Sequence, residues 1–589
     1  MKSPLKSWVR ALEMTAPIAR EPRRTLPIVI DELAERFNDG PALVSPEATL
    51  NYGQLAAYCA RYARWAVAEG LRPGDTVGLM MGNCAHYMAT WLGLTRAGIS
   101  VALLNTQLRG AVLAHCIRIV APKLMIVGSQ YCDTVPDART LLDPGMPWWA
   151  HGAGAHELPR VDLAVEQVPS SALTDTEIAR PSIDDRALFI YTSGTTGLPK
   201  AANVSHFRVM QWSHWFAGMM ATGPTDRMYD CLPLYHSVGG VVATGATLVG
   251  GGTVILRERF SARDFWRDVV EERCTLFQYI GELCRYLVAT PANAHEALHS
   301  LRLCCGNGLR GEVWEEFQRR FRIPQILEYY ASTEGNFSLY NCEGKAGAIG
   351  RIPPFLKHRM PVEIVRFDQE TETPTRDAAG HCARCDVNET GEAIGALPSG
   401  DDTQLARFEG YADATATSKK ILHNVFVAGD AWYRTGDLMR RDEQGFFYFV
   451  DRVGDTFRWK GENVSAAEVS GIVAACPGVS DAAVYGVQVP GTEGRAGMAA
   501  IVTRPGFDLK LFRDHLSLRL PDYARPVFVR IVPAMQLTGT FKLSKQSLMT
   551  DGFDPARASA VYIEDRAREA YVELDGAIYA QLQAGALKL

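Results

Sequence analysis

The stretch at residues 189–200 holds the side chains of this chain that are best suited to chemistry. An apolar run, Phe189-Ile190-Tyr191, leads into hydroxyl residues and glycines and ends at Lys200. Glycines allow backbone N–H groups to turn toward a ligand without Cβ clashes, hydroxyls add donors, and the lysine adds positive charge. Such a loop is built to hold phosphate, so a nucleoside triphosphate is the expected ligand. The residues expected to bind the nucleotide here are Tyr191, Thr192, Ser193, Gly194, Thr195, Thr196, Gly197 and Lys200.

This loop differs from the Walker phosphate-binding pattern. No Gly-Lys-Ser/Thr sequence closes it, and Pro199 stands where a phosphate-binding helix would begin. A surface turn rich in glycine and threonine is the alternative interpretation. The order of the twelve positions from 189 to 200 favours the phosphate loop.

Length and composition indicate a globular protein with more than one domain. A chain of 589 residues exceeds the size at which one hydrophobic core keeps growing. Hydrophobic residues make up 47% and charged residues 22%, as in ordinary globular proteins. The net charge of −5 argues against a general nucleic-acid binder, so no nucleic-acid partner is expected. Residues 238–256 are apolar but dense in glycine, and no transmembrane span is predicted.

The thirteen cysteines are scattered, and no cleavable signal peptide precedes them. Reduced thiols in a cytoplasmic setting are therefore expected, without disulfides. His381, Cys382 and Cys385 form one His-Cys-x-x-Cys cluster. A tetrahedral zinc site usually needs a second ligand pair at a fitting distance, and the sequence offers none, so no metal is expected there.

The first 24 residues are basic and carry a few apolar side chains. Leu5, Trp8 and Leu12 stand among lysines and arginines. Such a segment could lie on an anionic membrane surface, which would make the protein peripheral at the inner face of a membrane. A solvated basic helix is the equal alternative.

Apolar strand-like runs alternate with helical patterns along most of the chain. Residues 76–80 and 99–103 read as strands, and residues 86–96 as a helix between them. This alternation predicts an α/β fold in which helices cover parallel-rich sheets. Residues 350–444 are punctuated by proline and glycine and predict a compact β-rich subdomain. Together these parts form a large N-terminal domain, residues 1–450.

A second, smaller domain is predicted at residues 451–589. Residues 446–450 read as a strand, and the polar turn at 451–455 follows as a hinge. Beyond it, strands at 482–487 and 498–502 alternate with helices at 466–475 and 509–519. This pattern indicates a small, mobile α+β module.

The phosphate loop resembles the corresponding loop of adenylate-forming enzymes, the superfamily of acyl-CoA synthetases, luciferases and peptide-synthetase adenylation domains. A second stretch resembles the aromatic-Gly-x-Thr-Glu element of that superfamily: Tyr330, Ala331, Ser332, Thr333 and Glu334. The resemblance implies that Tyr330 packs on adenine and that Glu334, with Thr195, holds Mg²⁺ near the phosphates. Ala331 replaces the usual glycine. A surface acid is the alternative for Glu334.

Residues 433–437, Tyr-Arg-Thr-Gly-Asp, resemble the element that binds ribose in the superfamily. The resemblance implies that Asp437 accepts hydrogen bonds from both ribose hydroxyls. A carboxylate suits two vicinal hydroxyl donors, because it offers two acceptor oxygens at similar spacing. Asp451 and Arg452 open the hinge element, and the resemblance implies that Arg452 contacts ribose or phosphate. Gly454 stands where many relatives carry Asp or Lys as the pivot, which predicts a looser hinge.

Four stretches look like the fatty acid transport protein or very-long-chain acyl-CoA synthetase branch: residues 231–237, 279–287, 306–310 and 454–465. The resemblance implies that Gly461 lines the path of the pantetheine arm of coenzyme A, with Lys460, Glu462 and Asn463 beside it. It also places Gly306, Asn307 and Gly308 at the nucleotide. We expect Tyr235 and His236 to form a gate at the acyl channel. A simple turn is the alternative for Gly461, and a core aromatic with a satisfied histidine is the alternative for the gate.

Residues 537–545 resemble the C-terminal loop that delivers the adenylating lysine. Alignment assigns that role to Lys542, with Lys545 as the second candidate. Most relatives read Gly-Lys at this point, whereas this chain reads Phe541-Lys542. A solvated basic turn is the alternative.

Together the motifs imply a ligase that uses ATP, Mg²⁺ and coenzyme A on a long or very long chain fatty acid. The acid attacks the α-phosphate to give an acyl-adenylate and pyrophosphate, and the thiol of coenzyme A then displaces AMP. One alternative is a ligase for another acid, such as a carnitine-like, aryl or bile acid. The other is a fatty acid transporter or binding protein with vestigial ATP chemistry. The partners are then small molecules, and a homo-oligomer is left open.

Overall fold

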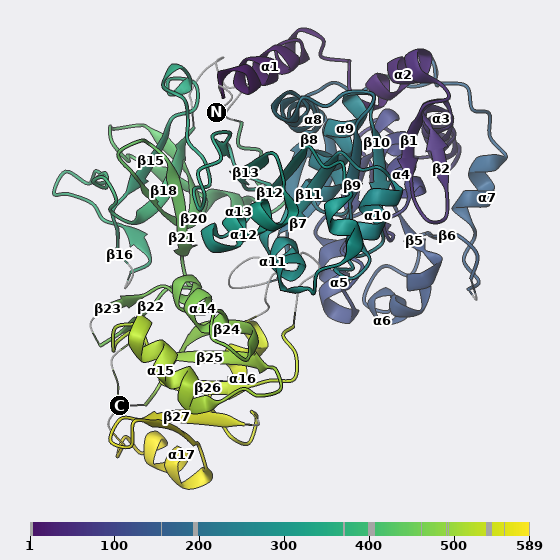
Figure 1. Cartoon of the computed structure of the whole chain (residues 1–589). Helices are drawn as coiled ribbons and strands as arrows, with labels where there is room; N and C mark the ends of the chain where they lie inside the picture. Colours follow the sequence, from purple (N-terminus) through teal and green to yellow (C-terminus); the bar gives the residue numbers. More distant parts are fainter. Residues whose placement is uncertain are drawn as a thin grey trace. The chain divides into compact units, whose positions relative to one another are not determined.

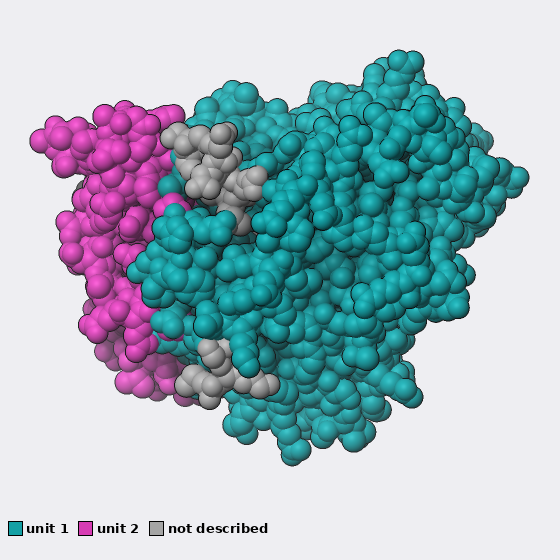
Figure 2. Space-filling view, turned by 90° about the horizontal axis from the view of Figure 1, so that it is seen from above, with its two compact units in different colours: residues 1–360, 396–421 teal, residues 361–395, 422–589 magenta. Residues whose placement is uncertain are grey.

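The computed structural model describes residues 4–154, 156–192, 198–368, 371–397, 407–460, 462–490, 492, 494–536, 545–558 and 560–587. The chain divides by its internal contacts into two compact units (Figure 2). Unit 1 comprises Met1–Met360 and Ala396–Ile421, and unit 2 comprises Pro361–Gly395 and Leu422–Leu589. The mixed α/β class, with a large N-terminal and a small C-terminal part, is confirmed. The boundary after residue 450 and the hinge at 451–455 stay predictions.

The larger sheet of unit 1 has eight strands in the order β14-β13-β12-β11-β9-β10-β1-β2 (Figure 1). The inner strands are parallel, and an antiparallel strand closes each edge. In sheet order their bounds are Ser338–Asn341, Ile326–Ala331, Leu303–Asn307, Leu276–Ile280, Arg227–Asp230, Thr253–Leu256, Pro41–Val44 and Thr49–Asn51.

Helices cover both faces of this sheet. Phe216 of α8 (His206–Met220) packs on Tyr329 of β13, with ring centroids 4.7 Å apart. Phe265 of α10 (Phe265–Glu271) packs on Phe277 of β11, also at 4.7 Å. The strand register places Tyr329 and Phe277 on opposite faces. Burial on both sides explains why these strands are almost wholly apolar.

The second sheet of unit 1 has six strands in the order β6-β5-β3-β4-β7-β8, parallel except for β8. In sheet order their bounds are Trp148–His151, Leu124–Gly128, Thr76–Met80, Ser100–Leu103, Arg186–Thr192 and Lys200–Ser205. The predicted strands at 76–80 and 99–103 are confirmed as β3 and β4. The predicted helix at 86–96 is confirmed as α4 (Ala85–Arg96).

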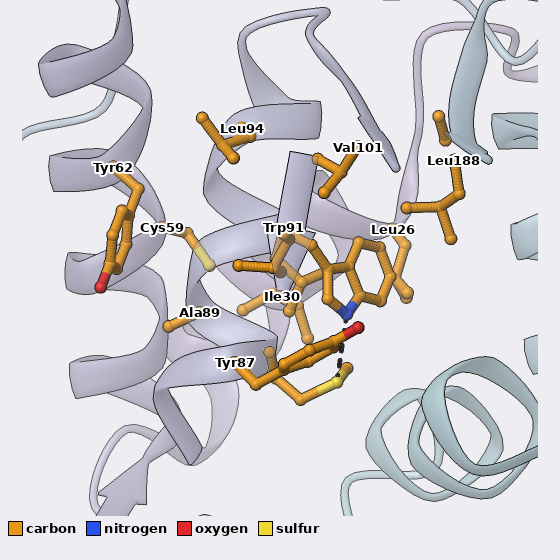
Figure 3. Close-up of a cluster of buried hydrophobic side chains, with 14 of the residues drawn as sticks. Leu26, Ile30, Cys59, Tyr62, Tyr87, Ala89, Trp91, Leu94, Val101 and Leu188 are labelled. Atoms are coloured by element: carbon orange, nitrogen blue, oxygen red, sulfur yellow. Dashed lines mark hydrogen bonds between the residues drawn. The ribbon is translucent and has the colours of Figure 1, made fainter. Parts of the chain in front are cut away.

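One side of this second sheet packs against a large hydrophobic core (Figure 3). Val101 of β4 and Leu188 of β7 meet Trp91 of α4 there, together with side chains of α2 (Leu26–Phe37) and α3 (Tyr52–Ala68). The Trp91 indole Nε1–H donates to Met88 Sδ at 3.2 Å, so this buried polar group has a partner. The core fixes β4 and β7, and thereby the strand that leads into the phosphate loop.

The other helical segments of unit 1 are short or peripheral. They are η1 Ile18–Arg20, α5 Gly110–Arg118, η2 Ser129–Thr134, α6 Pro136–Arg139, α7 Val161–Glu166, η3 Val238–Ala243, α9 Thr244–Val249, α11 Gly281–Ala289, η4 Ala294–Ala297, α12 Gly311–Phe321, η5 Pro354–Leu356 and α13 Ala414–Ser418. The apolar stretch at 238–256 is thus divided among η3, α9 and β10.

The basic N-terminal segment forms α1 (Leu5–Thr15), which packs on α8. Trp8 is 2% exposed and meets the rings of Trp215 and Tyr340 edge-on at 5.9 and 5.5 Å. Arg10 Nε donates to the Gly218 carbonyl at 2.6 Å. The helix therefore packs on unit 1 through Trp8, while Leu5, Lys6 and Val9 are exposed, and a role at a membrane surface stays a prediction.

Unit 2 begins with the predicted β-rich region. β15 (Val362–Val365), β18 (Gly391–Ala396), β20 (Ala431–Arg441) and β19 (Ile421–His423) form a sheet in that order, and β21 (Phe447–Arg452) pairs with β20. A small hairpin, β16 (Phe367–Asp368) and β17 (Thr373–Pro374), lies within the region.

The C-terminal residues of unit 2 form the predicted α+β module. Its sheet, in strand order, is β24 Val479–Val487, β25 Ala496–Thr503, β26 Phe528–Ile531, β27 Val561–Asp565 and β28 Ala570–Glu573. The helices are α14 Ala466–Ala474, α15 Leu509–Arg519, α16 Gln546–Asp551 and α17 Gly576–Gln583, and β22 (Phe457–Trp459) and β23 (Glu462–Val464) form a hairpin. The predicted helices at 466–475 and 509–519 are confirmed as α14 and α15.

All thirteen cysteine thiols are free. Within the described ranges, no group of three or more His, Cys, Asp or Glu side chains is arranged to hold a metal ion, and this includes the region of His381, Cys382 and Cys385. In the same part of the chain, no helix has the length and apolar character needed to cross a membrane.

Candidate active site

The phosphate loop connects two antiparallel strands. Thr192, at the end of β7, pairs with Lys200, at the start of β8. A Walker loop leads from a strand into a helix, so this hairpin connection agrees with the difference seen in the sequence. Residues 193–197, with Ser193, Gly194, Thr195, Thr196 and Gly197, lie outside the described residues. The structure therefore places the two ends of the loop.

The side chain of Tyr191, the last apolar residue before the loop, is buried. It is 6% exposed and lies in a core cluster with Phe189 under β7. The Tyr191 hydroxyl donates to the Cys116 carbonyl at 2.7 Å. The backbone of Tyr191 is thus the part that continues toward the loop.

A short segment at residues 409–412 extends the second sheet beyond β8. Asn203 N donates to the Gly410 carbonyl at 3.0 Å, and Ala412 N donates to the Ala201 carbonyl at 2.9 Å. This pairing brings the ring of Tyr411 beside Lys200, whose Nζ lies 5.6 Å from the ring centroid. The segment therefore adds an aromatic side chain to the lysine end of the phosphate loop.

Tyr411 also contacts Glu334, the predicted metal ligand. The Tyr411 hydroxyl donates to Glu334 Oε1 at 2.7 Å, and Glu334 is 8% exposed. Burial, followed by the nearby Glu334 charge, raises the pKa of Tyr411 above its usual value, so the hydroxyl keeps its proton at neutral pH. Glu334 is thus an oriented carboxylate beside the lysine end of the loop, and not a surface acid.

The backbone around Glu334 is held by a buried arginine. Arg208 of α8 donates through Nη1 to the carbonyl oxygens of Thr333 and Gly335, at 2.7 and 2.9 Å. It also contacts the Arg407 carbonyl, at 2.6 Å from Nη2, and Glu409 Oε1, at 3.7 Å from Nε. Arg208 therefore fixes the turn on both sides of Glu334.

The residues around Glu334 suit Mg²⁺ that arrives with a nucleotide. Mg²⁺ takes hard oxygen ligands and is commonly bound by one or two carboxylates together with substrate phosphates. Glu334 supplies one carboxylate, and the described residues contain no multi-carboxylate cage. A single oriented carboxylate near a phosphate loop fits this mode.

The remaining residues of the Glu334 element belong to the end of β13 and the turn after it. Tyr330 is partly buried, and its ring centroid lies 5.9 Å from that of Phe337. Ala331 pairs with Ser338 of β14, and Ser332 accepts the Gly335 N–H through its carbonyl. The edge hairpin β13–β14 thus positions the element predicted to meet adenine.

The predicted acyl gate lies next to the Glu334 turn. Tyr235 is 6% exposed, and its ring centroid is 4.8 Å from that of His236. Ser237 Oγ is 3.3 Å from Thr333 Oγ1, which connects this segment to the turn. A π-helical turn, η3, begins at Val238, and such turns often occur at functional sites.

Gly306, Asn307 and Gly308 lie where β12 ends. A Cβ at Gly306 would come within 2.2 Å of the Tyr279 carbonyl oxygen on β11, so only glycine allows this approach. Glu328 of β13 is fully buried and accepts hydrogen bonds from the Tyr279 hydroxyl and from Leu309 N. Burial raises the pKa of Glu328 to about 8. Glu328 therefore holds the turn that carries Gly308.

In unit 2, the two predicted ribose residues lie together. Asp437 of β20 and Arg452 of β21 are register partners, and Arg452 Nε is 3.3 Å from Asp437 Oδ1. The carboxylate side chain is 9% exposed and the arginine side chain 37%. The strand pairing thus forms a carboxylate and guanidinium pair, and its role in binding ribose and phosphate stays a prediction.

The predicted hinge residues contact the C-terminal module. Asp451 is 3% exposed and accepts from Ser465 Oγ at 3.0 Å and from Ala467 N at 3.3 Å. Gly454 has φ of +89°, a backbone conformation that favours glycine. Asp455 Oδ1 is 3.5 Å from Lys545 Nζ. Lys545 therefore binds a hinge carboxylate, while Lys542 lies outside the described residues.

The predicted coenzyme A residues lie at the β22–β23 hairpin. Lys460 has φ of +53°, as tight hairpin turns require, and its Nζ lies 5.8 Å from the Trp459 ring. Lys460 is exposed, and partial desolvation, followed by the charge of Arg566, lowers its pKa. Glu462 is exposed. Gly461 and the side chain of Asn463 lie outside the described residues.

Three residues of the candidate site were not predicted from the sequence: Arg208, Glu328 and Tyr411. Each acts on a partner that is distant in sequence, so local spacing gave no signal.

Two family models match this chain. Residues 30–380 match the AMP-binding enzyme family, and residues 468–542 match the AMP-binding enzyme C-terminal domain. Long-chain fatty acid transport protein 1 of Mus musculus is 40% identical over 588 residues, covering 96% of this chain and 88% of its own length. Long-chain fatty acid transport protein 3 of Homo sapiens is 41% identical over 529 residues, covering 88% of this chain and 76% of its own.

Solved structures share the fold. The anthranilate CoA ligase AuaEII in complex with anthranoyl-AMP has a TM-score of 0.76 at 19% identity, over 89% of this chain and 96% of its own. ATP-bound MatB from Rhodopseudomonas palustris has a TM-score of 0.73 at 22% identity, over 89% of this chain and 98% of its own. The chain therefore belongs to the AMP-binding enzyme family, in the branch of the long-chain fatty acid transport proteins and very-long-chain acyl-CoA synthetases.

Proposed function

We propose that the protein is an AMP-forming ligase that joins long or very long chain fatty acids to coenzyme A. The observation that carries the proposal is the oriented Glu334 carboxylate beside Lys200 and the end of the phosphate loop. A fatty carboxylate is anionic and lacks a leaving group, so a thiol cannot displace anything from it directly. Activation by ATP removes that obstacle.

In the first proposed step the carboxylate attacks the α-phosphate of ATP, which gives acyl-adenylate and pyrophosphate. Negative charge gathers around the phosphorus, and preorganised positive charge and donors lower that barrier. Lys200 and Lys542 would provide positive charge, and the loop hydroxyls would donate hydrogen bonds. Asp437 and Arg452 would bind the ribose and phosphate. Mg²⁺, held by Glu334 with Thr195, would offset charge on the phosphates.

In the second proposed step the thiol of coenzyme A attacks the acyl carbonyl and AMP leaves. Lys542 must withdraw before the thiol arm can enter, so the C-terminal domain would rotate about residues 451–455. Gly461, with Lys460, Glu462 and Asn463, would then line the path of the pantetheine arm. No covalent bond to the protein is required in either step.

The names of the relatives refer to long-chain fatty acids, which supports that substrate class. The position of Tyr235 and His236 beside the Glu334 turn supports their role at the acyl channel. His236→Ala should change the rate or the chain-length profile. An unchanged rate and profile would remove His236 from the channel.

The experiment that tests the proposal measures pyrophosphate release and acyl-CoA formation with a panel of acids. The panel contains medium, long and very long chain fatty acids and aryl, carnitine-like and bile acids. Preference for long or very long chain fatty acids supports the proposal. Preference for another acid would mean that the protein is a ligase for that acid. Glu334→Gln keeps the shape of the side chain and removes its charge, so it should reduce pyrophosphate release with every acid of the panel.

The word transport in the names of the relatives favours one second candidate, a membrane-associated fatty acid transporter. Vesicles that carry the protein but lack ATP and coenzyme A separate the two functions. Uptake of labelled fatty acid under those conditions would indicate transport without ligation. Uptake that needs both substrates would assign it to the ligase reaction.

A further inference from the structure

Tyr411 contacts two charged groups of the candidate site at once. Its hydroxyl donates to Glu334 Oε1 at 2.7 Å, and the face of its ring receives the Lys200 ammonium at 5.6 Å. The residue is 6% exposed. The buried Tyr411 side chain therefore contacts both Glu334, the predicted metal ligand, and Lys200, the lysine at the end of the phosphate loop.

The backbone fixes the position of this tyrosine. Tyr411 forms an antiparallel bridge with Ala202 of β8, and its N–H donates to Thr417 Oγ1 at 2.9 Å. Ala202 and Ala416 pack against it. Because the ring is held by strand pairing and by small apolar neighbours, the hydroxyl has little freedom in where it points.

A tyrosine orients Glu334 without cancelling its charge. Arg208 already fixes the backbone on both sides of Glu334, but it donates to carbonyl oxygens and not to the carboxylate. The neutral Tyr411 hydroxyl engages Oε1 alone. The hydrogen bond thus holds one carboxylate oxygen in place and adds no positive charge to the site.

We propose that Tyr411 is a positioning residue that sets the Glu334 carboxylate for a divalent cation accompanying the nucleotide, while its ring holds Lys200 at the loop. This inference rests on the proposed function, since it assigns metal binding to Glu334. Tyr411 lies outside all the sequence motifs described above. The ligand is the cation together with triphosphate oxygens.

The test compares Tyr411→Phe with the wild-type protein. Phenylalanine keeps the ring beside Lys200 and removes only the hydroxyl donor. Binding of Mn²⁺ in the presence of a non-hydrolysable ATP analogue, followed by electron paramagnetic resonance, should weaken roughly tenfold, the scale of one lost hydrogen bond to a charged group. Nucleotide affinity without a divalent cation should not change. The Mg²⁺ concentration for half-maximal adenylation should rise by a similar factor.

Tyr448→Phe is the matched control. The Tyr448 hydroxyl donates to Asp442 Oδ2 at 3.0 Å in unit 2, so the same substitution removes a tyrosine–carboxylate hydrogen bond elsewhere. It should leave Mn²⁺ binding unchanged. Tyr411→Leu removes the ring as well, and should also weaken binding of the ATP analogue without a cation.

A double-mutant cycle distinguishes positioning from a general loss of structure. If Tyr411 acts through Glu334, Tyr411→Phe should have no further effect on Mn²⁺ binding in a Glu334→Gln background. Additive losses, or unchanged Mn²⁺ affinity in Tyr411→Phe, would overturn the proposal. The binding measurement needs no turnover, so a failure of the proposed fatty acid activity would leave this result independent.

Discussion

The candidate site residues of unit 1 and unit 2 are held by different kinds of interaction. In unit 1, Glu334 is fixed by a neutral hydroxyl, and its backbone is fixed by a buried arginine. In unit 2, Asp437 pairs with Arg452 and Asp455 pairs with Lys545. Each of these ion pairs has one side chain that is 37% exposed.

The difference indicates which groups can change partners. Hydrogen bonds between buried groups are costly to break, because a buried polar atom is then left unpaired. Ion pairs that reach solvent are weak and are screened by salt. We therefore expect unit 1 to offer a fixed phosphate and metal site, and the charged residues of unit 2 to be exchanged between the two half-reactions.

The largest effect is expected at Lys542. If this lysine acts only while the acid attacks ATP, Lys542→Ala should slow adenylate formation by on the order of a hundredfold, the scale of one lost charge-stabilising donor. Conversion of supplied acyl-adenylate to acyl-CoA should remain. Single-turnover pyrophosphate release and thioester formation measure the two steps separately.

Gly461→Leu is the converse control, since it should block the pantetheine path while pyrophosphate release continues. Equal impairment of both steps by Lys542→Ala would contradict the exchange of partners. A larger effect of Lys545→Ala on adenylation would move the catalytic role from Lys542 to Lys545.

The next largest effect is expected at Asp437. Asp437→Ala removes the carboxylate proposed for the ribose hydroxyls and leaves Arg452 without this partner, a loss of about 2 kcal/mol, or roughly thirtyfold in ATP affinity. Calorimetric titration with ATP measures it. Asp437→Asn keeps one acceptor oxygen and should lose less. Unchanged ATP affinity in Asp437→Ala would remove this residue from the site.

The fold could be predicted from sequence where hydrophobic runs decide it. All five residues of β3 are buried, so a short apolar run sufficed to locate it. The side-chain direction of Tyr191 was missed, although the two-residue period of a strand places it with Phe189 on the core face of β7. Trp8 was interpreted as surface because its partners, Trp215 and Tyr340, are far away in the sequence.

The motif residues of the site could be located, but their supports could not. Arg208 reaches a carbonyl 125 residues away, and Tyr411 reaches a carboxylate 77 residues away. Spacing along the chain carries no information about such contacts, because the tertiary fold creates them. The same reason applies to Glu328, whose sequence neighbours are apolar and whose partners lie at the ends of β11 and β12.

The buried carboxyl of Glu328 should make the stability of unit 1 depend on pH. Its pKa is raised from 4.5 to about 8, so between these values the folded state keeps a proton that the unfolded state releases. The stability of unit 1 should therefore fall as pH rises through this range, by roughly 1 kcal/mol per pH unit from this group. Glu328→Gln should flatten the dependence. Urea unfolding followed by tryptophan fluorescence at several pH values measures it.

Glu573→Gln provides the control, because Glu573 is exposed in β28 and the change should leave the pH dependence as it is. An equal slope in wild type and Glu328→Gln would mean that Glu328 is ionised in the folded protein. The contrast between buried hydrogen-bonded groups in unit 1 and partly exposed ion pairs in unit 2 would then lose one of its supports.

The smallest effect is expected for the pair between Lys545 and Asp455. The side chains are 20% and 37% exposed, and the Nζ to Oδ1 distance is 3.5 Å. Such a pair contributes about 0.5 kcal/mol and weakens with salt. Asp455→Asn should therefore shift the balance between the half-reactions only about twofold at low salt, and not at all in molar salt. Single-turnover rates of both steps across a salt series measure this.

Because Tyr411→Phe removes a hydrogen bond between buried groups, its effect should persist at all salt concentrations. If both variants respond alike to salt, the two units do not differ in the way their charged groups are held.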